Sequence, residues 1–338
     1  MNIIYYIVLF IALSPGFICN SLHTRYKVSA GVVILHAVIY AVILYLLKSY
    51  SEGYTSENEI NKKLHTKVVV ASHTGYGDIM NHIAAVTYLA SIYDEVVLCI
   101  VKGQTAKVKP FFSHIPNLVL YEYSFDSTTH TIYTMVDNVR QDLEKFKPTH
   151  DIRVGGVFNA IQNKHASHTD IIPYNFYSDL GLDPRIYYTH NHINNVPESI
   201  NLYNSVKHIP YIFISTATHT HGEPFSVEQV ENHFNISRNT HLIICSDKNI
   251  YPENHSYYTI ANAFVLKPFL DYVDTLIHAS KIIVSDSSMF CLAMKLPIKT
   301  DECYHVVRNN MNYSYLWSPE YGFDKNFSEL KVFKELKF

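Results

Sequence analysis

Short runs of β-branched residues alternate along this chain with segments in which apolar residues recur at helical spacing. The first such unit spans residues 67–90, where a buried strand at 68–70 precedes a polar turn and a helix. The apolar face of that helix is formed at i, i+4, i+7 and i+11 by Ile79, Ile83, Val86 and Ala90. This is the opening βα unit of a Rossmann-like layer, and its turn is expected at the carboxyl end of the strand, where open α/β sheets bind ligands.

A polar turn of sequence HTGYGD joins the strand and the helix of this first unit. Gly75 and Gly77 give the backbone freedom where a side chain would obstruct the turn. Asp78 is predicted to be the N-cap of the helix, because aspartate accepts hydrogen bonds from the unpaired amides of a first turn. A carboxylate here also suits a catalytic role, in which it takes the proton from a hydroxyl group. The residue type alone leaves both roles open.

The alternation of strands and helices continues along the rest of the chain. Further strands are predicted at Glu95–Val101, Asn117–Tyr121, Asp151–Val154, Tyr211–Ser215, His241–Cys245, Ala263–Leu266 and Ile282–Val284. Helices are predicted for a stretch ending at His114, for residues 136–147, for Ser226–Phe234, around Val273–Ile277, and after Ser288. Two successive βαβ series predict an α/β fold with two Rossmann-like domains facing a cleft, at residues 67–195 and 196–338.

Two long apolar runs precede the first unit. Residues 31–47 carry few polar atoms, which predicts a membrane helix at the short end of the spanning range of about 17–25 residues. Residues 3–19 are broken by Ser14, Pro15 and Gly16, so they fit either a second membrane helix or a cleaved signal peptide. Residues 1–50 are therefore expected to anchor the protein in a membrane, with the polar residues 51–66 as a linker. Arg25 and Lys27 lie between the two runs and Lys48 follows the second, which leaves the orientation open.

Composition disfavours several classes of partner and site. The net charge of −3, with 17% charged residues, gives no basic surplus to attract nucleic acid, and no nucleic-acid partner is expected. The five cysteines lie far apart and show no CxxC spacing. Neither a disulfide framework nor a zinc knuckle is therefore predicted.

Sites for dinucleotides, P-loop nucleotides and metals all fit the chain poorly. The HTGYGD turn has two of the three glycines of a dinucleotide fingerprint, and no P-loop lysine follows them. The HxH pairs His190 with His192 and His219 with His221 look like metal ligands, but too few residues follow them for a metal-dependent hydrolase barrel. No DxD pair is present to hold a divalent cation against a nucleotide diphosphate. Neither a metal nor a cofactor is expected.

The turns that remain carry Asp78 and the trio Asp286, Ser287 and Ser288. The trio caps a predicted helix whose apolar side is Met289, Leu292, Ala293 and Leu296. Unpaired amides and the positive end of a helix attract anions without lysine or arginine. The second turn is therefore predicted to hold a diphosphate, while Asp78 would activate a hydroxyl group.

In these two segments the sequence resembles glycosyltransferases of the GT-B fold, closest to the family of ADP-heptose:lipopolysaccharide heptosyltransferases. In that family a first strand leads to a glycine-aspartate turn and a helix, which Gly77-Asp78-Ile79 matches. The second family signature, a helix and a strand followed by an aspartate-led turn, is matched by Leu270 to Leu296 with Asp286 in place. The resemblance implies that Asp78 is the catalytic base. The order of predicted strands and helices matches the family over residues 67–300. The residues themselves match only in these two segments.

The chain departs from the family at three places. Ser288 stands where the family has glycine, and Cys291 stands where it has histidine. No lysine follows the predicted strand Tyr211–Ser215, where the family places a cation near the sugar nucleotide. His219 or His221 is expected to take that place, partly protonated at neutral pH.

These observations together predict a membrane-anchored glycosyltransferase that moves a sugar from a nucleotide-sugar donor to a glycan or lipid-linked acceptor. The reaction is expected to invert configuration and to need no metal. The donor is predicted to bind at Asp286, Ser287, Ser288, His219 and His221, and the turn near the acceptor to be His73, Thr74, Gly75 and Gly77. The alternative is a catalytically inactive module of the same fold that binds a glycan or a protein partner.

Overall fold

The structure is a computed structural model that describes residues 65–71, 75–124, 139–155, 172–183, 185–217, 222–285, 287–306 and 333–338. The chain divides into two compact units, Met1–Leu64 and His65–Phe338, and every described residue lies in the second. Both predicted membrane runs lie outside the described residues. Within the described ranges, no helix is both long and apolar enough to cross a membrane.

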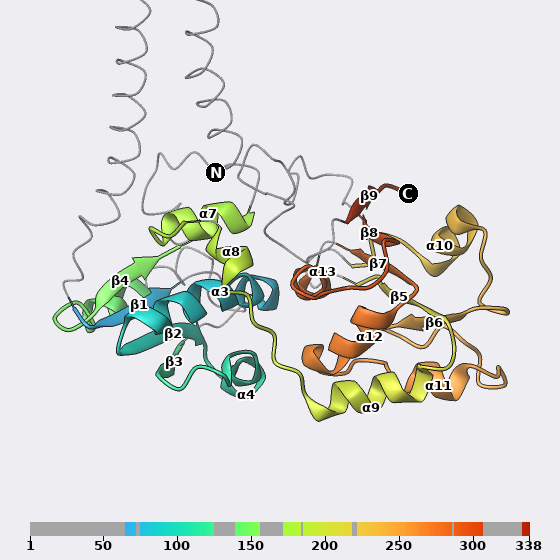
Figure 1. The fold of residues 1–338 in the computed structure, drawn as a ribbon, viewed down its shortest axis with the longest axis horizontal. Helices are drawn as coiled ribbons and strands as arrows, with labels where there is room; N and C mark the ends of the chain where they lie inside the picture. Colours follow the sequence, from blue (N-terminus) through green and yellow to red (C-terminus); the bar gives the residue numbers. More distant parts are fainter. Residues whose placement is uncertain are drawn as a thin grey trace, which may run out of the picture. The chain divides into compact units, whose positions relative to one another are not determined.

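The first half of the second unit contains a four-stranded parallel sheet (Figure 1). Across the sheet its strands run in the order β3 (Leu118–Tyr123), β2 (Glu95–Val101), β1 (Lys67–Ala71) and β4 (Asp151–Val154). The central strands β1 and β2 are buried along nearly their whole length, because helices and loops cover both faces of a parallel sheet. The edge strand β3 is only partly buried.

Helix α3 (Tyr76–Ile92) follows β1 in the chain. The other helices of this half are α4 (Thr105–Val108), the 3₁₀ helix η1 (Lys109–Phe112), a helical stretch at 139–144, α7 (Ile172–Asp179) and α8 (Ile186–Thr189). α3 packs against η1, α7 and α8. Its predicted apolar face is confirmed, since Ile79, Ile83 and Val86 are buried and Ala90 is half-buried.

The second half contains a five-stranded parallel sheet. Its strands run in the order β6 (Leu242–Cys245), β5 (Tyr211–Ser215), β7 (Lys281–Ser285), β8 (Cys303–Val306) and β9 (Lys334–Leu336). Its helices are α9 (Pro197–Val206), α10 (Val227–Phe234), α11 (Tyr258–Asn262), η2 (Phe269–Tyr272), α12 (Val273–His278) and α13 (Ser288–Ala293). The predicted α/β class with parallel strands is confirmed.

One predicted strand is wrong. Ala263–Leu266 forms a turn after α11, and Leu266 takes a left-handed φ of 54°. The Leu266 amide donates to the carbonyl oxygen of Ser246 at 2.8 Å, so this segment crosses the end of β6 instead of joining the sheet. A short apolar run does not by itself distinguish a strand from a buried turn.

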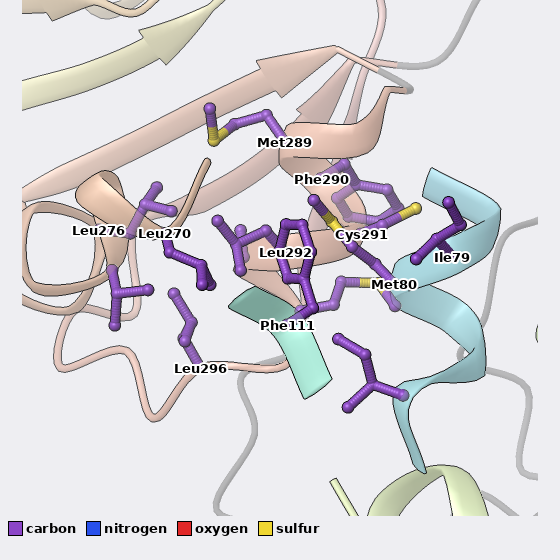
Figure 2. Close-up of a cluster of buried hydrophobic side chains, with 14 of the residues drawn as sticks. Ile79, Met80, Phe111, Leu270, Leu276, Met289, Phe290, Cys291, Leu292 and Leu296 are labelled. Atoms are coloured by element: carbon purple, nitrogen blue, oxygen red, sulfur yellow. The ribbon is translucent and has the colours of Figure 1, made fainter. Parts of the chain in front are cut away.

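The two halves share one hydrophobic core. Its largest cluster of buried side chains includes residues of β1 and α3 as well as residues of β5, α12 and α13. Figure 2 shows this cluster where α3, η1 and α13 meet, with Met80, Phe111 and Leu292 among the labelled side chains. Because the core is continuous, the start of α13 is held against the start of α3.

Candidate active site

The strand order of each sheet indicates where a ligand would bind. In the first sheet the chain adds β2 and β3 on one side of β1 and then β4 on the other. In the second sheet it adds β6 on one side of β5 and then β7 on the other. The carboxyl ends of β1, β5 and β7 therefore lie where the strand order reverses, and open parallel sheets bind ligands at such points. The turns after these strands form the candidate site.

The turn after β1 is closed by Asp78. α3 begins at Tyr76 with Gly75 as its N-cap, so Asp78 is its third residue, and the prediction that Asp78 is the N-cap is wrong. Its Oδ2 atom accepts a hydrogen bond from the Gly75 amide at 3.1 Å, as the third residue of a capping box does. A Cβ atom at Gly75 would lie 2.9 Å from that oxygen. A side chain at this position would therefore require the carboxylate to move.

The helix that carries Asp78 is held by a side chain from α7. The Tyr177 hydroxyl accepts from the Ala85 amide at 3.1 Å and donates to the Asn81 carbonyl at 2.9 Å. The Tyr177 hydroxyl therefore lies between the Asn81 carbonyl and the Ala85 amide, which would hydrogen-bond to each other directly in a regular helix. Buried His82 donates from Nδ1 to the Asp78 carbonyl at 2.5 Å. Burial raises the pKa of Tyr177, so its hydroxyl stays protonated and keeps both hydrogen bonds.

The turn after β7 leads into a helix of only six residues, α13. Ser287 is its N-cap with an extended backbone, but its hydroxyl makes no capping hydrogen bond. This oxygen is buried, and no described residue is hydrogen-bonded to it. Ser288 is half-buried, while Asp286 lies outside the described residues. Because so short a helix has a weak dipole, any anion at this turn would depend on the amides and hydroxyls of the two serines.

The turn after β1 and the turn after β7 touch each other. A methyl group at Gly77 would lie 3.3 Å from the Cys291 sulfur and 3.6 Å from the Ser288 hydroxyl oxygen. Figure 2 shows the Cys291 side chain of α13 extending toward the start of α3, where Ile79 lies. The φ angle of Gly77 is not positive, so the backbone conformation does not call for glycine. The absence of a side chain is what allows the close contact with α13.

The end of α13 places a lysine at the junction of the two halves. Lys295 is 3% exposed, and its Nζ lies 3.7 Å from the centroid of the Tyr187 ring in α8. No described residue accepts a hydrogen bond from this nitrogen. Burial lowers the pKa of Lys295 to about 7. Its protonation therefore changes near neutral pH, at a buried position against the Tyr187 ring.

The turn after β5 is organised by a carboxylate from a neighbouring strand. Asp247 follows β6, and its Oδ2 atom accepts hydrogen bonds from the amides of Thr216 at 2.6 Å and Ala217 at 3.0 Å. Sequence reasoning missed this residue because its partners lie 31 and 30 positions away. The available signal was an aspartate two residues after a buried strand, at the edge where ligands bind.

The predicted histidine pairs do not form a described metal site. His190 packs edge-on to Tyr88 with ring centroids 5.1 Å apart, whereas His192 packs on His114 at 4.3 Å, so the two rings have different neighbours. Over the described ranges, no three His, Cys, Asp or Glu side chains are grouped so that they could hold a metal ion. The predicted site residues outside the described part of the chain are His73, Thr74, His219, His221 and Asp286.

Four cysteines fall in the described part of the chain, and all are buried. Burial raises the pKa of Cys99 to about 12 and that of Cys245 to about 11. These two side chains are therefore thiols at neutral pH and act as small apolar groups in the sheets.

Comparison with known proteins finds similarity only to solved structures. No family model and no curated protein sequence matches the chain. The chain is similar to the iron-containing dodecameric glycosyltransferase TibC from enterotoxigenic E. coli H10407, with a TM-score of 0.44 and 16% identity over 75% of this chain and 61% of that chain. It is also similar to a family 9 glycosyl transferase from Veillonella parvula DSM 2008, with a TM-score of 0.47 and 11% identity over 82% of this chain and 87% of that chain.

A third similar structure is E. coli ADP-heptose lps heptosyltransferase II, with a TM-score of 0.42 and 10% identity over 80% of this chain and 90% of that chain. The similar structures include heptosyltransferases and a family 9 glycosyltransferase, and also a putative UDP-N-acetylglucosamine 2-epimerase from Listeria monocytogenes. The chain spans 61% of the length of TibC. Because every TM-score is below 0.5, the function of this chain has to rest on its own residues.

Proposed function

We propose that this protein is a glycosyltransferase that moves a sugar from a nucleotide-sugar donor to a hydroxyl group of a glycan or lipid-linked acceptor. The observation that carries the proposal is the contact between the first turns of α3 and α13 at Gly77 and Ser288. The turn with a carboxylate thereby lies beside the turn with two serine hydroxyls. A group that removes a proton and groups that hold an anion are then neighbours, as sugar transfer from a diphosphate requires.

In the proposed reaction Asp78 is the general base. Its carboxylate accepts the Gly75 amide, and a carboxylate has about four lone-pair sites in all. The acceptor hydroxyl gives its proton to this carboxylate while its oxygen attacks the anomeric carbon of the donor sugar. The bond from that carbon to the diphosphate breaks on the opposite face, and the diphosphate leaves with the electron pair. One such displacement inverts the configuration of the sugar.

The donor diphosphate is proposed to bind at the turn after β7. The buried Ser287 hydroxyl lacks a described partner, and a phosphate oxygen would accept its hydrogen. Ser288 and Asp286 belong to the same turn, and His219 or His221 would add positive charge when protonated. His73, Thr74, Gly75 and Gly77 would lie near the acceptor. In this proposal amides, hydroxyls and histidines bind the leaving diphosphate, and no metal takes part in the reaction.

The apolar runs within residues 1–50 are proposed to anchor the enzyme in a membrane, where a lipid-linked acceptor would be available. Fractionation tests this part separately. The full chain should pellet with membranes, and a chain that lacks residues 1–50 should stay in the supernatant. A truncated chain that still pellets in a folded state would contradict the anchor.

A panel of nucleotide sugars tests the activity. A ligand at a hundred times its Kd raises the free energy of unfolding by about 2.7 kcal/mol, which a thermal shift detects. At least one nucleotide sugar should shift the melting temperature, and adding an acceptor should release its nucleoside diphosphate. No shift across the panel would contradict the proposal and favour the inactive module that binds a glycan or a protein.

A further inference from the structure

Buried polar side chains gather at the carboxyl edge of the second sheet. Ser215 ends β5, Ser246 follows β6 and Ser285 ends β7, and none of these residues is more than 3% exposed. Buried hydroxyls need hydrogen-bond partners, because an unpaired polar group in the interior is costly. Asp247, at the same edge, supplies acceptors for two of these three hydroxyls.

The carboxylate of Asp247 divides its two oxygens between backbone and side chains. Oδ2 accepts from the amides of Thr216 and Ala217, at 2.6 and 3.0 Å, and from the Thr216 hydroxyl at 3.4 Å. Oδ1 accepts from the Ser246 hydroxyl at 3.2 Å and from the Ser215 hydroxyl at 3.5 Å. One carboxylate therefore ties the end of β6 to the turn after β5.

Two successive amides that converge on one oxygen form a small anion-binding nest. After a strand of a parallel sheet, such a nest would be open to a phosphate group, but here an anion of the same chain fills it. The Ser285 hydroxyl donates to the Ala217 carbonyl at 3.3 Å, which ties the same turn to β7 as well. In the sequence, His219 and His221 of the predicted donor site follow Ala217 within four positions.

We propose that Asp247 is a positioning residue, a built-in anion that holds the turn after β5 in the shape in which the donor is bound beside it. This inference rests on the proposed function, because it concerns the donor side of the same site. Because Asp247 fills the nest, the donor diphosphate would bind at the turn after β7 and not here.

Hydrogen exchange of the Thr216 and Ala217 amides in the full-length protein tests this inference without any donor. Both amides should exchange slowly in the wild-type protein, and Asp247→Ala should speed their exchange about tenfold or more. Sodium acetate should slow the exchange again in Asp247→Ala, because acetate can enter the vacated nest, whereas sodium chloride at equal ionic strength should not. Asp183→Ala is the matched control, since it removes a carboxylate that accepts the Arg185 amide in another turn.

Asp247→Asn keeps an acceptor oxygen at the same reach and removes only the charge. It should retain most of the protection, while the Thr216 and Ala217 amide proton resonances move upfield as the acceptor becomes neutral. Unchanged resonances in Asp247→Asn would overturn the inference even if Asp247→Ala did not fold. It would also be wrong if folded Asp247→Ala kept the wild-type exchange rates or did not respond to acetate.

Calorimetric titration with ADP and with UDP connects this turn to the donor. Asp247→Ala should bind the nucleotide that the wild-type protein binds with an affinity about tenfold lower, and acetate should restore the affinity. The affinity of Asp247→Asn should stay within about threefold of the wild-type value. Equal binding by wild-type and Asp247→Ala proteins would contradict a positioning role. If the wild-type protein bound neither nucleotide, the proposed function would be in question, and the exchange rates would still decide whether Asp247 holds the turn.

Discussion

Two aspartates at the carboxyl edges of the two sheets accept backbone amides over very different distances along the chain. Asp78 accepts the amide of Gly75, three positions away, and so closes the start of one helix. Asp247 accepts amides 31 and 30 positions away, and so joins the ends of two strands. The same chemical group is thus a local cap in one sheet and a tertiary tie in the other, because the fold decides which amides it meets.

The helices beside these aspartates differ as well. α3 has 17 residues and a closed first turn, and Tyr177 holds it from the side. α13 has six residues, and the Ser287 hydroxyl at its start has no described partner. In the proposed reaction a fixed first turn suits a base, whose position must not vary. A turn with unmet hydrogen-bonding groups suits a ligand that supplies the missing acceptors.

The largest expected effect is on turnover, which should depend on the carboxylate of Asp78. Asp78→Asn should lower turnover roughly 10²–10⁴-fold, because the amide cannot take the acceptor proton. Donor binding and stability should change little, since the asparagine oxygen can still accept the Gly75 amide. Turnover is measured on the donor found in the nucleotide-sugar panel, with Asp183→Asn as the control. Full activity in Asp78→Asn would leave Asp78 with only its capping role.

Lys295 extends the comparison to the junction between the halves. Burial lowers its pKa from 10.5 to about 7, which corresponds to a cost of roughly 5 kcal/mol at about 1.4 kcal/mol per pKa unit. Between these pH values the folded protein binds fewer protons than the unfolded chain, so stability should rise from pH 7 to 10.5. The cost is fully present below pH 7.

Lys295→Met keeps the volume of the side chain and removes the charge. It should raise the free energy of unfolding by about 2–5 kcal/mol at pH 6 and abolish the rise at higher pH. Urea unfolding between pH 6 and pH 10 measures both effects. Lys207→Met, an exposed control, should leave the pH profile unchanged. Parallel profiles for Lys295→Met and the wild-type protein would mean that the ammonium group is not buried in solution.

The stability of two alanine variants measures the difference between a local cap and a tertiary tie. Asp247→Ala should lose about 2–4 kcal/mol, because it leaves the buried Thr216 amide and the Ser215 and Ser246 hydroxyls without their acceptor. Asp78→Ala should lose only about 1 kcal/mol, as the loss of a helix cap does. Urea unfolding at pH 7 gives both values. Equal losses would remove the distinction between the two aspartates.

The smallest effect concerns the contact between the two turns. Gly77→Ala should cost about 1 kcal/mol, because a methyl group 3.3 Å from the Cys291 sulfur forces that sulfur to move by a few tenths of an ångström. Cys291→Ala removes the obstacle, so the double variant should be more stable than the sum of the two single effects allows. A double-mutant cycle by urea unfolding measures this coupling. Strict additivity would show that the two turns are not in contact in solution.

Misses in the predicted fold have identifiable causes. The strand β9 was not predicted because it has only three residues, two of them charged and exposed, and so carries no apolar pattern. Ala263–Leu266 was predicted as a strand because its apolar residues are consecutive, but the amides of Ala263, Phe264 and Val265 donate to carbonyls three positions earlier and so form a turn. Asp78 was predicted as the N-cap because acidic residues are favoured both at the N-cap and at the third residue of a helix. The residue type alone does not say which of these two positions the aspartate occupies.

The α/β class, the succession of βα units and the glycine-aspartate turn followed from the residues alone, because each depends on neighbours within a few positions of the chain. The contact of Gly77 with α13, the amides that Asp247 accepts and the burial of Lys295 over Tyr187 did not. The partners in these contacts are 30 or more positions apart in sequence, and only the packing of α3, α8 and α13 and the pairing of β5 with β6 bring them together. Hydrogen bonding and desolvation act over a few ångströms of space, so sequence distance carries no information about such pairs.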